Sequence, residues 1–143
     1  MLHFKISEFL RLRGDVQESV STSIAEKIIQ HHLYPLNNIR KQLGVPIHVT
    51  SGYRPEWWEI KQGRSGKSQH VFEGIGAVDV SLFGNKDLYP RLFAMLSNQY
   101  RRIAYYPEQN FVHLDYGAIS LQCFIARDGS WNHVSYEDLI KPA

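Results

Sequence analysis

Mostly apolar positions recur at helical spacing in the first third of the chain and would share one face of a helix. The positions that share this face are Ile24, Ile28, His32, Leu36, Ile39 and Leu43. This period predicts a helix that packs against a core. Ser23, with Glu26 three residues later, has the spacing of a capping box at the helix start. Pro35 should kink or split the helix near Tyr34, because its ring clashes with the preceding turn. Gly44 is a natural stop.

A second helical pattern runs from about Asp87 to Gln99. Pro90 falls in its first turn, where the missing N–H costs least. The positions expected to face the core are Leu88, Leu92, Met95 and Leu96. This helix is therefore expected to cover one side of whatever sheet the chain forms.

Five further segments alternate apolar and polar residues, the period of a strand with one buried face. They are 45–50, 77–82, 103–106, 111–116 and 119–126. Residues 107–110 read as a hairpin turn, and Asp128-Gly129 has turn chemistry after the last segment. Helices followed by hairpin-linked strands are typical of the α+β class. We predict a single α+β domain over residues 1–143, with N-terminal helices packed on a largely antiparallel sheet.

Composition excludes several classes of protein. The 143 residues suit one domain, and a 43% hydrophobic content is that of an ordinary globular protein. Sixteen Lys and Arg against 14 Asp and Glu give a charge of only +2, so we expect no nucleic-acid binding. The single cysteine, Cys123, excludes a Cys-rich zinc site. We expect no membrane span, no signal peptide, and synthesis in the cytoplasm.

The alternation also places polar side chains on shared faces. If the valines of segment 77–82 face the core, Asp79 faces the other way. By the same rule His113 and Asp115 emerge together, with Cα atoms ~6.6 Å apart. His70 lies in a polar loop just before the Asp79 strand. Two histidines and a carboxylate suit catalytic zinc, which keeps one coordination position open; ordinary surface or hydrogen-bonded histidines are the alternative.

Three ordered motifs strengthen the zinc interpretation. They read Thr50-Ser-Gly-Tyr-Arg54, then Ser68-Gln-His70 leading to Gly76-Ala-Val-Asp79, then Phe111-Val-His113-Leu-Asp115. Together they resemble the M15 family of zinc peptidases, which includes D-alanyl-D-alanine carboxypeptidases and peptidoglycan endopeptidases, some of them phage lysins. The similarity is greatest to a short branch that ends in GYYP…FVHxDxG, matched here by Ala104-Tyr-Tyr-Pro107 and Phe111 to Gly117. It spans roughly Phe4 to Gly117.

The resemblance implies one Zn²⁺ per chain, held by His70, Asp79 and His113. One departure concerns spacing: Asp79 follows His70 by nine positions, more than is usual in the family. The stretch 71–76 must therefore bulge, and its glycines permit that.

The resemblance also implies substrate contacts. Arg54 corresponds to an arginine that approaches the substrate's carboxylate or backbone, and its planar fork suits bidentate pairing; capping its own turn is the alternative. Ser68 and Gln69 are expected to contact substrate or support the first ligand, with plain loop solvation as the alternative. Trp57 and Trp58 could line a cleft or cover a core edge.

The general base is the second departure. Many relatives carry an acidic residue three positions before the last histidine ligand, where this chain has Asn110. Asp115 could act as the base, or it could orient His113 through the other ring nitrogen. Glu108 is the second candidate for the base.

The expected function is zinc-dependent hydrolysis of peptide bonds in peptidoglycan stem peptides or cross-links, of carboxypeptidase or endopeptidase type, as in a phage lysin. We expect a monomer that acts on the cell wall after release from the cytoplasm. The alternative is a non-catalytic, metal-containing module of the same fold that binds the wall or belongs to a virion. The acid missing at Asn110 favours that alternative.

Overall fold

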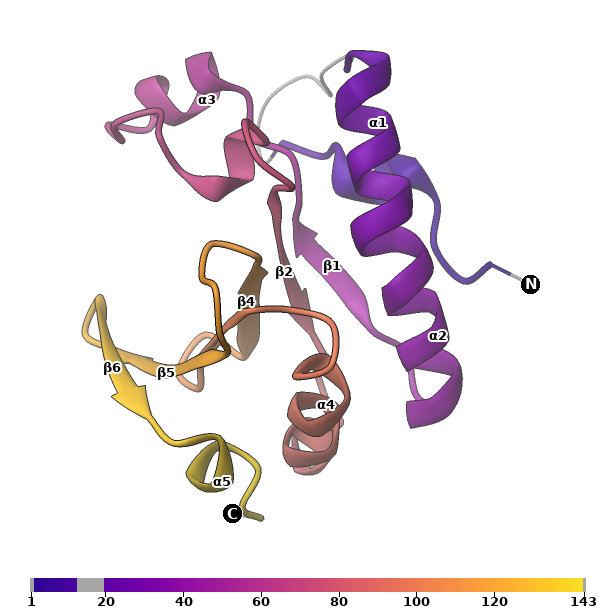
Figure 1. The fold of residues 1–143 in the computed structure, drawn as a ribbon, viewed down its shortest axis with the longest axis vertical. Helices are drawn as coiled ribbons and strands as arrows, with labels where there is room; N and C mark the ends of the chain where they lie inside the picture. Colours follow the sequence, from indigo (N-terminus) through magenta and orange to yellow (C-terminus); the bar gives the residue numbers. More distant parts are fainter. Residues whose placement is uncertain (1, 13–19, 143) are drawn as a thin grey trace.

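The computed structural model describes residues 2–12 and 20–142. Its centre is a six-stranded sheet in the order β1-β2-β4-β3-β5-β6 (Figure 1). The strands are β1 (His48–Ser51), β2 (Ala77–Ser81), β3 (Arg102–Tyr106), β4 (Phe111–Asp115), β5 (Gln122–Arg127) and β6 (Ser130–Val134). Neighbouring strands are antiparallel except β3 and β5, which are parallel. This confirms the predicted α+β class with a largely antiparallel sheet.

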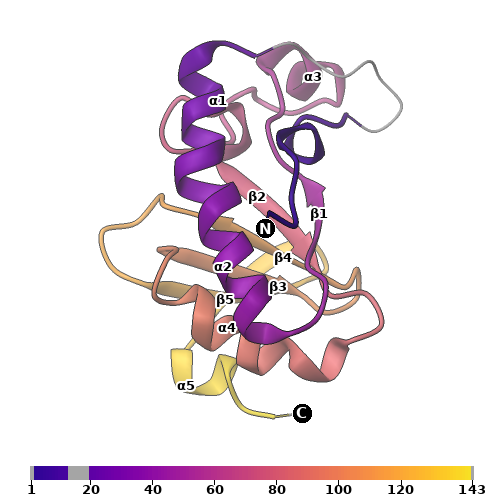
Figure 2. The same ribbon diagram turned by 90° about the vertical axis from the view of Figure 1, so that its right-hand side faces the viewer.

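The helices at residues 22–43 and 89–96 pack on one face of the sheet, and the helix at residues 56–61 lies apart from them (Figure 2). The helical elements are η1 (Ile6–Phe9), α1 (Thr22–Ile28), η2 (Ile29–Leu33), α2 (Tyr34–Leu43), α3 (Glu56–Lys61), η3 (Gln69–Val71), η4 (Lys86–Leu88), α4 (Tyr89–Leu96) and α5 (Tyr136–Leu139). Side chains of α1, α2 and α4 share one apolar core with the sheet. Within the described residues, no helix has the length and apolar character needed to cross a membrane.

The N-terminal helix forms as predicted, but its cap lies elsewhere. Ser21, with extended backbone, precedes the helix and its hydroxyl accepts a hydrogen bond from the Ile24 N–H. The predicted capping box at Ser23 is therefore wrong, because Ser23 already lies in the first helical turn. Ser21 supplies the side-chain acceptor that the free N–H groups of this turn need.

Pro35 changes the helix without splitting it. A π-helical turn, η2, precedes it, in which the Tyr34 N–H bonds to the Ile29 carbonyl five residues back. Pro35 has no N–H for the His31 carbonyl four residues earlier. The Tyr116 hydroxyl donates to that carbonyl at 2.7 Å, so a residue beside β4 satisfies the acceptor that proline leaves free.

The second predicted helix is shorter than expected. A 3₁₀ turn, η4, occupies its start, and α4 ends at Leu96, after which turns carry the chain to β3. Leu92 and Leu96 are fully buried, as predicted, while Leu88 and Met95 pack at the margin of the core.

Two α-helices, α3 and α5, one strand, β6, and the short 3₁₀ turns η1 and η3 were not predicted. The sequence of β6, Ser-Trp-Asn-His-Val, has no buried side chain, so it shows none of the alternation that marked the other strands. It pairs with β5 through a two-residue turn in which Asp128 and Gly129 both have positive φ. That geometry matches the twist of a tight hairpin.

The central strands carry an apolar face and a polar face. Asp79 on β2 lies directly opposite His113 on β4, and Ala77 lies opposite Asp115. Directly opposed residues share one face of a sheet, so Asp79, His113 and Asp115 all lie on the side away from the core valines and leucines. The alternation predicted this shared face.

Candidate metal centre

Three side chains converge on the polar face of the sheet. His70 Nε2 lies 3.2 Å from Asp79 Oδ1 and 3.2 Å from His113 Nδ1, and His113 Nδ1 lies 2.9 Å from the same carboxylate oxygen. In a tetrahedral site with ligands at 2.0–2.1 Å from zinc, neighbouring donors are about 3.3 Å apart. The three atoms therefore already have nearly the separation that a single ion requires.

His70 is fixed by the backbone around it. Its Nδ1 donates to the Gly52 carbonyl at 2.8 Å, which leaves Nε2 free to face Asp79. The His70 carbonyl accepts from the Arg54 N–H, and the Ser68 hydroxyl accepts from the His70 N–H. The histidine is 1% exposed. These bonds fix both the tautomer and the ring orientation, as in metal sites with a supported histidine.

The Gly52 carbonyl is held in place by the N-terminal segment. A Cβ at Gly52 would lie within 2.3 Å of the Phe9 carbonyl oxygen, so a larger residue does not fit. That same Phe9 oxygen accepts a hydrogen bond from the Tyr53 N–H at 2.7 Å. The turn η1 therefore packs directly against the backbone that supports His70.

The stretch between His70 and Asp79 bulges, as its length required, and helix α1 with η2 anchors it. Phe72 has a left-handed backbone (φ 63°), and its ring occupies the space a side chain at Gly76 (φ 93°) would need. Lys27 donates to the carbonyls of Phe72 and Glu73. The buried His32 contacts the Ile75 carbonyl through Nε2 at 3.0 Å. The extra residues are therefore an anchored loop.

Asp115 supports His113 from the opposite side. Its Oδ2 lies 2.7 Å from His113 Nε2, while Arg102 donates to both carboxylate oxygens at 2.7 Å. The Gly117 N–H donates to Oδ1. Both oxygens of Asp115 are thus occupied, and the residue is fully buried. A carboxylate in this position orients the imidazole and makes its other nitrogen a better ligand.

The electrostatics follow from this arrangement. Burial alone would lower the pKa of His113, but hydrogen bonds to Asp115 and Asp79 outweigh it and raise the pKa to about 9. Burial works against the carboxylates of Asp79 and Asp115, yet the groups that face them hold the pKa of each well below the ordinary range. Burial lowers the pKa of His70. Both carboxylates are therefore ionised at neutral pH. Asp79 faces the two histidines and can bind a cation with them, whereas the oxygens of Asp115 are already occupied.

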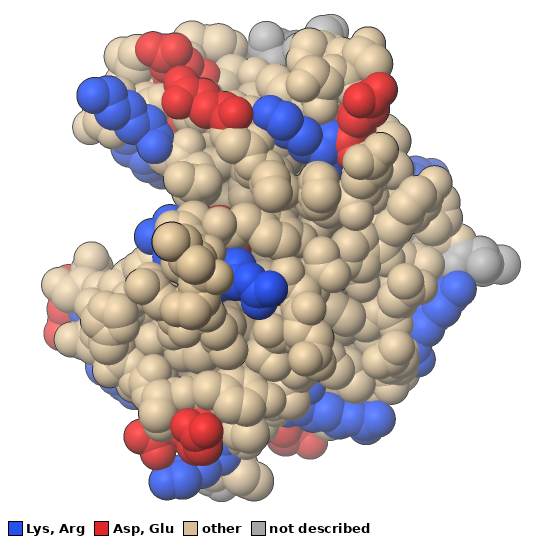
Figure 3. Space-filling model, viewed as in Figure 1, with Lys and Arg blue, Asp and Glu red and all other residues tan. Residues whose placement is uncertain are grey.

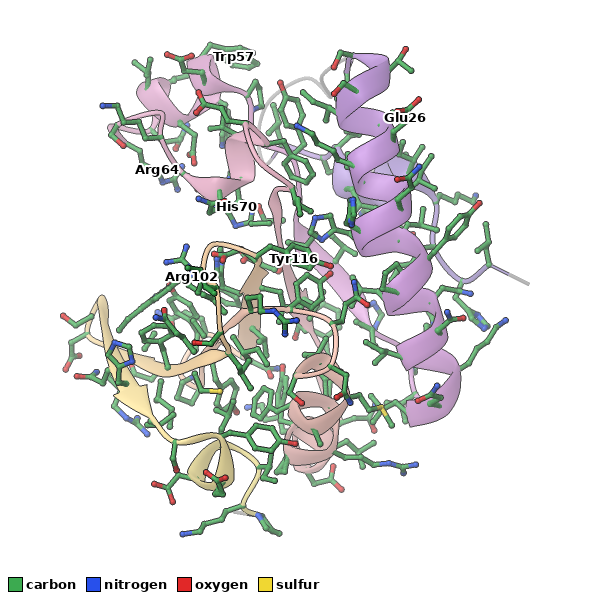
Figure 4. The ribbon with its side chains drawn as sticks, viewed as in Figure 1. Glu26, Trp57, Arg64, His70, Arg102 and Tyr116 are labelled. Carbon is green, nitrogen blue, oxygen red and sulfur yellow. The ribbon has the colours of Figure 1, made fainter. Side chains whose placement is uncertain are left out.

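The donors open into a cleft between the segment that carries α3 and the β5–β6 hairpin (Figure 3). A pocket of about 320 Å³ lies there, lined by Arg54, Lys67, Ser68, Gln69, His70, Arg102, Tyr106, His113, Asp115 and Trp131. Figure 4 shows His70 and Arg102 facing each other across this cleft from different elements. The charged groups of the lining are cationic apart from the ion-paired Asp115, and the rest are histidines, the polar Ser68 and Gln69, and two aromatic residues.

Arg54 lines the pocket with a buried acidic partner behind it. Its Nε lies 3.6 Å from Oε1 of Glu59, a fully buried residue of α3 that also pairs with Arg64 at 2.6 Å. Burial lowers the pKa of Arg54 from its ordinary value, while Asp79 and Glu59 act against that shift. Helix α3 was not predicted, and neither was this support for Arg54.

Ser68 and Gln69 lie at the mouth of the pocket, each partly exposed. The Ser68 hydroxyl caps the short turn that carries His70 by accepting a hydrogen bond from the His70 N–H. Glu108 lies exposed in the β3–β4 turn and is not among the described residues that line the pocket. Trp58 is 7% exposed, with its ring 6.2 Å from that of Trp57, whereas Trp57 is 44% exposed and points away from the cleft (Figure 4).

Asn110 serves the fold. It has a positive φ of 60°, its side-chain oxygen accepts from the Tyr89 hydroxyl at 2.7 Å, and its amide donates to the Phe83 carbonyl. The Asn110 backbone carbonyl also accepts from Ser81. The position that is acidic in many relatives is therefore used here to hold the β3–β4 turn against the end of β2.

Sequence reasoning missed Lys67, Arg102, Tyr106 and Trp131 as members of the site. Arg102 and Tyr106 lie on β3, and Trp131 lies on the unpredicted strand β6. The signal for Arg102 was available in principle, since β3 pairs with β4 in a hairpin and Arg102 lies opposite Asp115. The Asp128-Gly129 turn signal is typical of a tight hairpin and could have placed β6 beside β5, but β6 itself showed no strand pattern.

Fold and donor set together define an α+β domain whose described residues include a candidate three-ligand metal site beside a cleft. The chain belongs to the peptidase M15 family, which it matches over residues 2–115. The match confirms the resemblance seen in the motifs and includes all three metal-facing residues. No curated protein matches the chain.

Proposed function

We propose that this protein is a zinc-dependent peptidase that hydrolyses peptide bonds in peptidoglycan stem peptides or cross-links. The observation that carries the proposal is the convergence of His70, Asp79 and His113, with the second ring nitrogen of each histidine held by a hydrogen bond. Membership of a peptidase family supports hydrolysis of a peptide. We further propose that the protein reaches the wall after release from the cytoplasm, as a phage lysin does.

The donor set fits zinc in kind as well as in spacing. Two imidazole nitrogens and one carboxylate oxygen are a typical catalytic zinc set, which leaves a position for water or substrate. Bound zinc supplies a Lewis acid and a water of lowered pKa. The protein's part is to hold the donors: the Gly52 carbonyl orients His70, and Asp115 orients His113.

Arg54 is proposed to bind the substrate's carboxylate. It lines the pocket from the turn after β1, and its Nε lies 3.6 Å from a carboxylate oxygen of the buried Glu59. Lys67 adds a second positive charge at the pocket's edge. A peptide end that carries a carboxylate would therefore be drawn to this side of the cleft, since opposite charges attract strongly where water is partly excluded.

Asp115 is proposed to orient His113, the second of the two roles considered from the sequence. Both of its oxygens already accept hydrogen bonds from Arg102, and one also bonds His113. A base needs a free oxygen within hydrogen-bond reach of the proton it takes. The strongly lowered pKa of Asp115 also makes it a weak base.

A second candidate function follows from the same observation. Among the described residues that line the pocket, Asp115 is the one with a carboxylate, and both of its oxygens already accept hydrogen bonds. A domain that holds zinc and binds wall peptides without cleaving them would have this arrangement. We therefore retain a non-catalytic wall-binding or virion module as the alternative.

Digestion of purified peptidoglycan distinguishes the two. The zinc-loaded protein should release fragments, identified by mass spectrometry, and a chelator should stop the release until zinc is restored. The fragment masses would show which bond is cut. Sedimentation of the protein with intact walls, with no fragment released under either condition, would instead support the binding module.

A further inference from the structure

The segment that follows the family match reaches back into the site. The match ends at residue 115, whereas β5, β6 and α5 span 122–139. From this segment Trp131 enters the pocket beside the metal-facing residues. We propose that Trp131, together with Tyr106, forms an aromatic wall that selects peptides with a small aliphatic side chain beside the scissile bond. This inference rests on the proposed function and deepens it.

Trp131 is held rigidly at its edges. Its indole N–H donates to the Tyr106 hydroxyl at 2.6 Å, its ring lies 4.9 Å from that of Phe124, and the Arg102 guanidinium lies 5.4 Å from its centre. A hydrogen bond, an aromatic contact and a cation–π contact together restrict the ring to one orientation. The wall is therefore formed before a substrate arrives.

The aromatic wall lies next to the metal-facing residues. The rings of Trp131 and His113 are 5.2 Å apart, and Tyr106 lies on β3, the strand next to the one that carries His113. A peptide whose scissile carbonyl meets the donor set must therefore place an adjacent side chain near the indole. The size of the space left there limits which side chain fits.

The opposite side of the pocket is cationic. Arg54 and Lys67 bring positive charge from the segment after β1, while Trp131 and Tyr106 contribute the aromatic surface, with Arg102 stacked on Trp131. The pocket volume of about 320 Å³ is near the lower end for ligand sites. This combination fits a short peptide end: a carboxylate toward Arg54 and Lys67, and a methyl-sized side chain against the indole.

Trp131 does not belong to the apolar core. Within the described residues, the apolar core includes side chains of β5 and α5 but does not include Trp131, which stays partly exposed. By contrast Trp58 is only 7% exposed. A tryptophan held in place by polar contacts, yet left open to a pocket, suits contact with a ligand.

The test compares two peptides and three variants, all loaded with zinc. The peptides are a stem pentapeptide ending in D-Ala-D-Ala and its analogue ending in D-Ala-D-Leu. The variants are Trp131→Ala, Trp131→Phe and, as a matched control, Trp57→Ala on the exposed face of α3. Dissociation constants are measured by calorimetry and kcat/KM by release of the terminal residue, with zinc content and circular dichroism recorded for each protein.

The parent and Trp57→Ala should favour the D-Ala peptide. Trp131→Ala should reduce that preference about 10-fold, the scale on which apolar pockets discriminate by size, and Trp131→Phe should lie between. If the parent binds both peptides but cleaves neither, the proposed function is overturned. The aromatic wall is then tested by the ratio of the two dissociation constants. Equal losses on both peptides, a loss of zinc in Trp131→Ala, or no binding by the parent would overturn the aromatic wall.

Discussion

The two sides of the cleft are built in different ways. The donor set lies on neighbouring central elements, where strand register places Asp79 opposite His113 and both are nearly buried. The aromatic side lies toward the edge of the sheet, where Trp131 is partly exposed on an outer hairpin. Positions fixed by register and burial suit chemistry that needs precise geometry. Exposed positions at an edge can change without disturbing that geometry, which suits selectivity.

Removal of a central donor should have the largest effect. His70→Ala removes one of three ligands and leaves Asp79 and His113 with an incomplete site. The variant should lose stoichiometric zinc, all hydrolysis, and the thermal stabilisation that zinc gives the parent, because binding to the folded state adds to stability. Elemental analysis and melting curves with and without added zinc measure this.

The matched control is His133→Ala, an exposed histidine on β6. It should keep the parent's zinc content and activity. Stoichiometric zinc in His70→Ala would show that the ion is held elsewhere.

The donor side was largely predictable from sequence, and the aromatic side was not. Alternation in segments 77–82 and 111–116 placed Asp79 and His113 on one face, and the register of β2 with β4 agrees. Such patterns exist because those strands each bury one face in the core. Strand β6 has no buried side chain, so Trp131 carried no periodic signal.

The support around the donors was also beyond the sequence. The Gly52 carbonyl holds His70 and the Arg102 guanidinium holds Asp115. These contacts depend on tertiary packing between segments that local periodicity treats separately. The capping error at Ser23 has a related cause: Ser21 and Ser23 both precede the apolar pattern, and only backbone geometry shows which one is the cap.

Loss of the Arg54 guanidinium, which lines the same pocket as the aromatic wall, should have the next largest effect. Arg54→Ala removes a charge-assisted pair of about 1.5–3 kcal/mol, which corresponds to a fall in kcat/KM of roughly 10- to 150-fold. Zinc content should stay at the parent's level, because Arg54 is not a ligand. Steady-state kinetics on a stem peptide, beside elemental analysis, measures both.

Two outcomes would reassign Arg54. Unchanged kcat/KM would limit Arg54 to its contacts with Glu59 and its own turn. A fall in zinc content together with activity would make it a support for His70, whose carbonyl bonds the Arg54 N–H.

Asp115→Asn tests how the donor side is supported. Asparagine keeps the shape but removes the charge that faces Arg102 and His113. Zinc affinity should fall ~10- to 100-fold, and saturating zinc should restore most of the hydrolysis if the residue only orients His113. Competition with a chromophoric chelator measures the affinity, and activity is followed across a zinc titration.

Glu108→Gln is the comparison variant. Because Glu108 lies exposed in the β3–β4 turn, its loss should cost little. An inactive Asp115→Asn at full zinc occupancy would make Asp115 the base, whereas an inactive Glu108→Gln would move that role to the turn.

His32 extends the comparison to the helical side of the sheet, where the effect should fall on stability alone. His32 is fully buried, and its Nε2 donates to the Ile75 carbonyl while its Nδ1 accepts from the Tyr100 hydroxyl. Burial lowers the pKa of His32 to about 4, with His31 and His70 acting in the same direction and Asp115 and the Ile75 carbonyl against it. The folded protein therefore holds this imidazole neutral at neutral pH.

The direction of the pH effect follows from linkage. Between pH 6.5 and 4 the unfolded chain binds the His32 proton and the folded chain does not, so acid favours unfolding. The stabilisation is present above pH 6.5 and about 3 kcal/mol of it is lost by pH 4. His32→Gln keeps one donor and one acceptor but does not titrate, so its free energy of unfolding should fall less steeply across this range. Urea unfolding of the metal-free parent and variant from pH 7.5 to 4 measures the difference, and identical slopes would show that His32 titrates alike in both states.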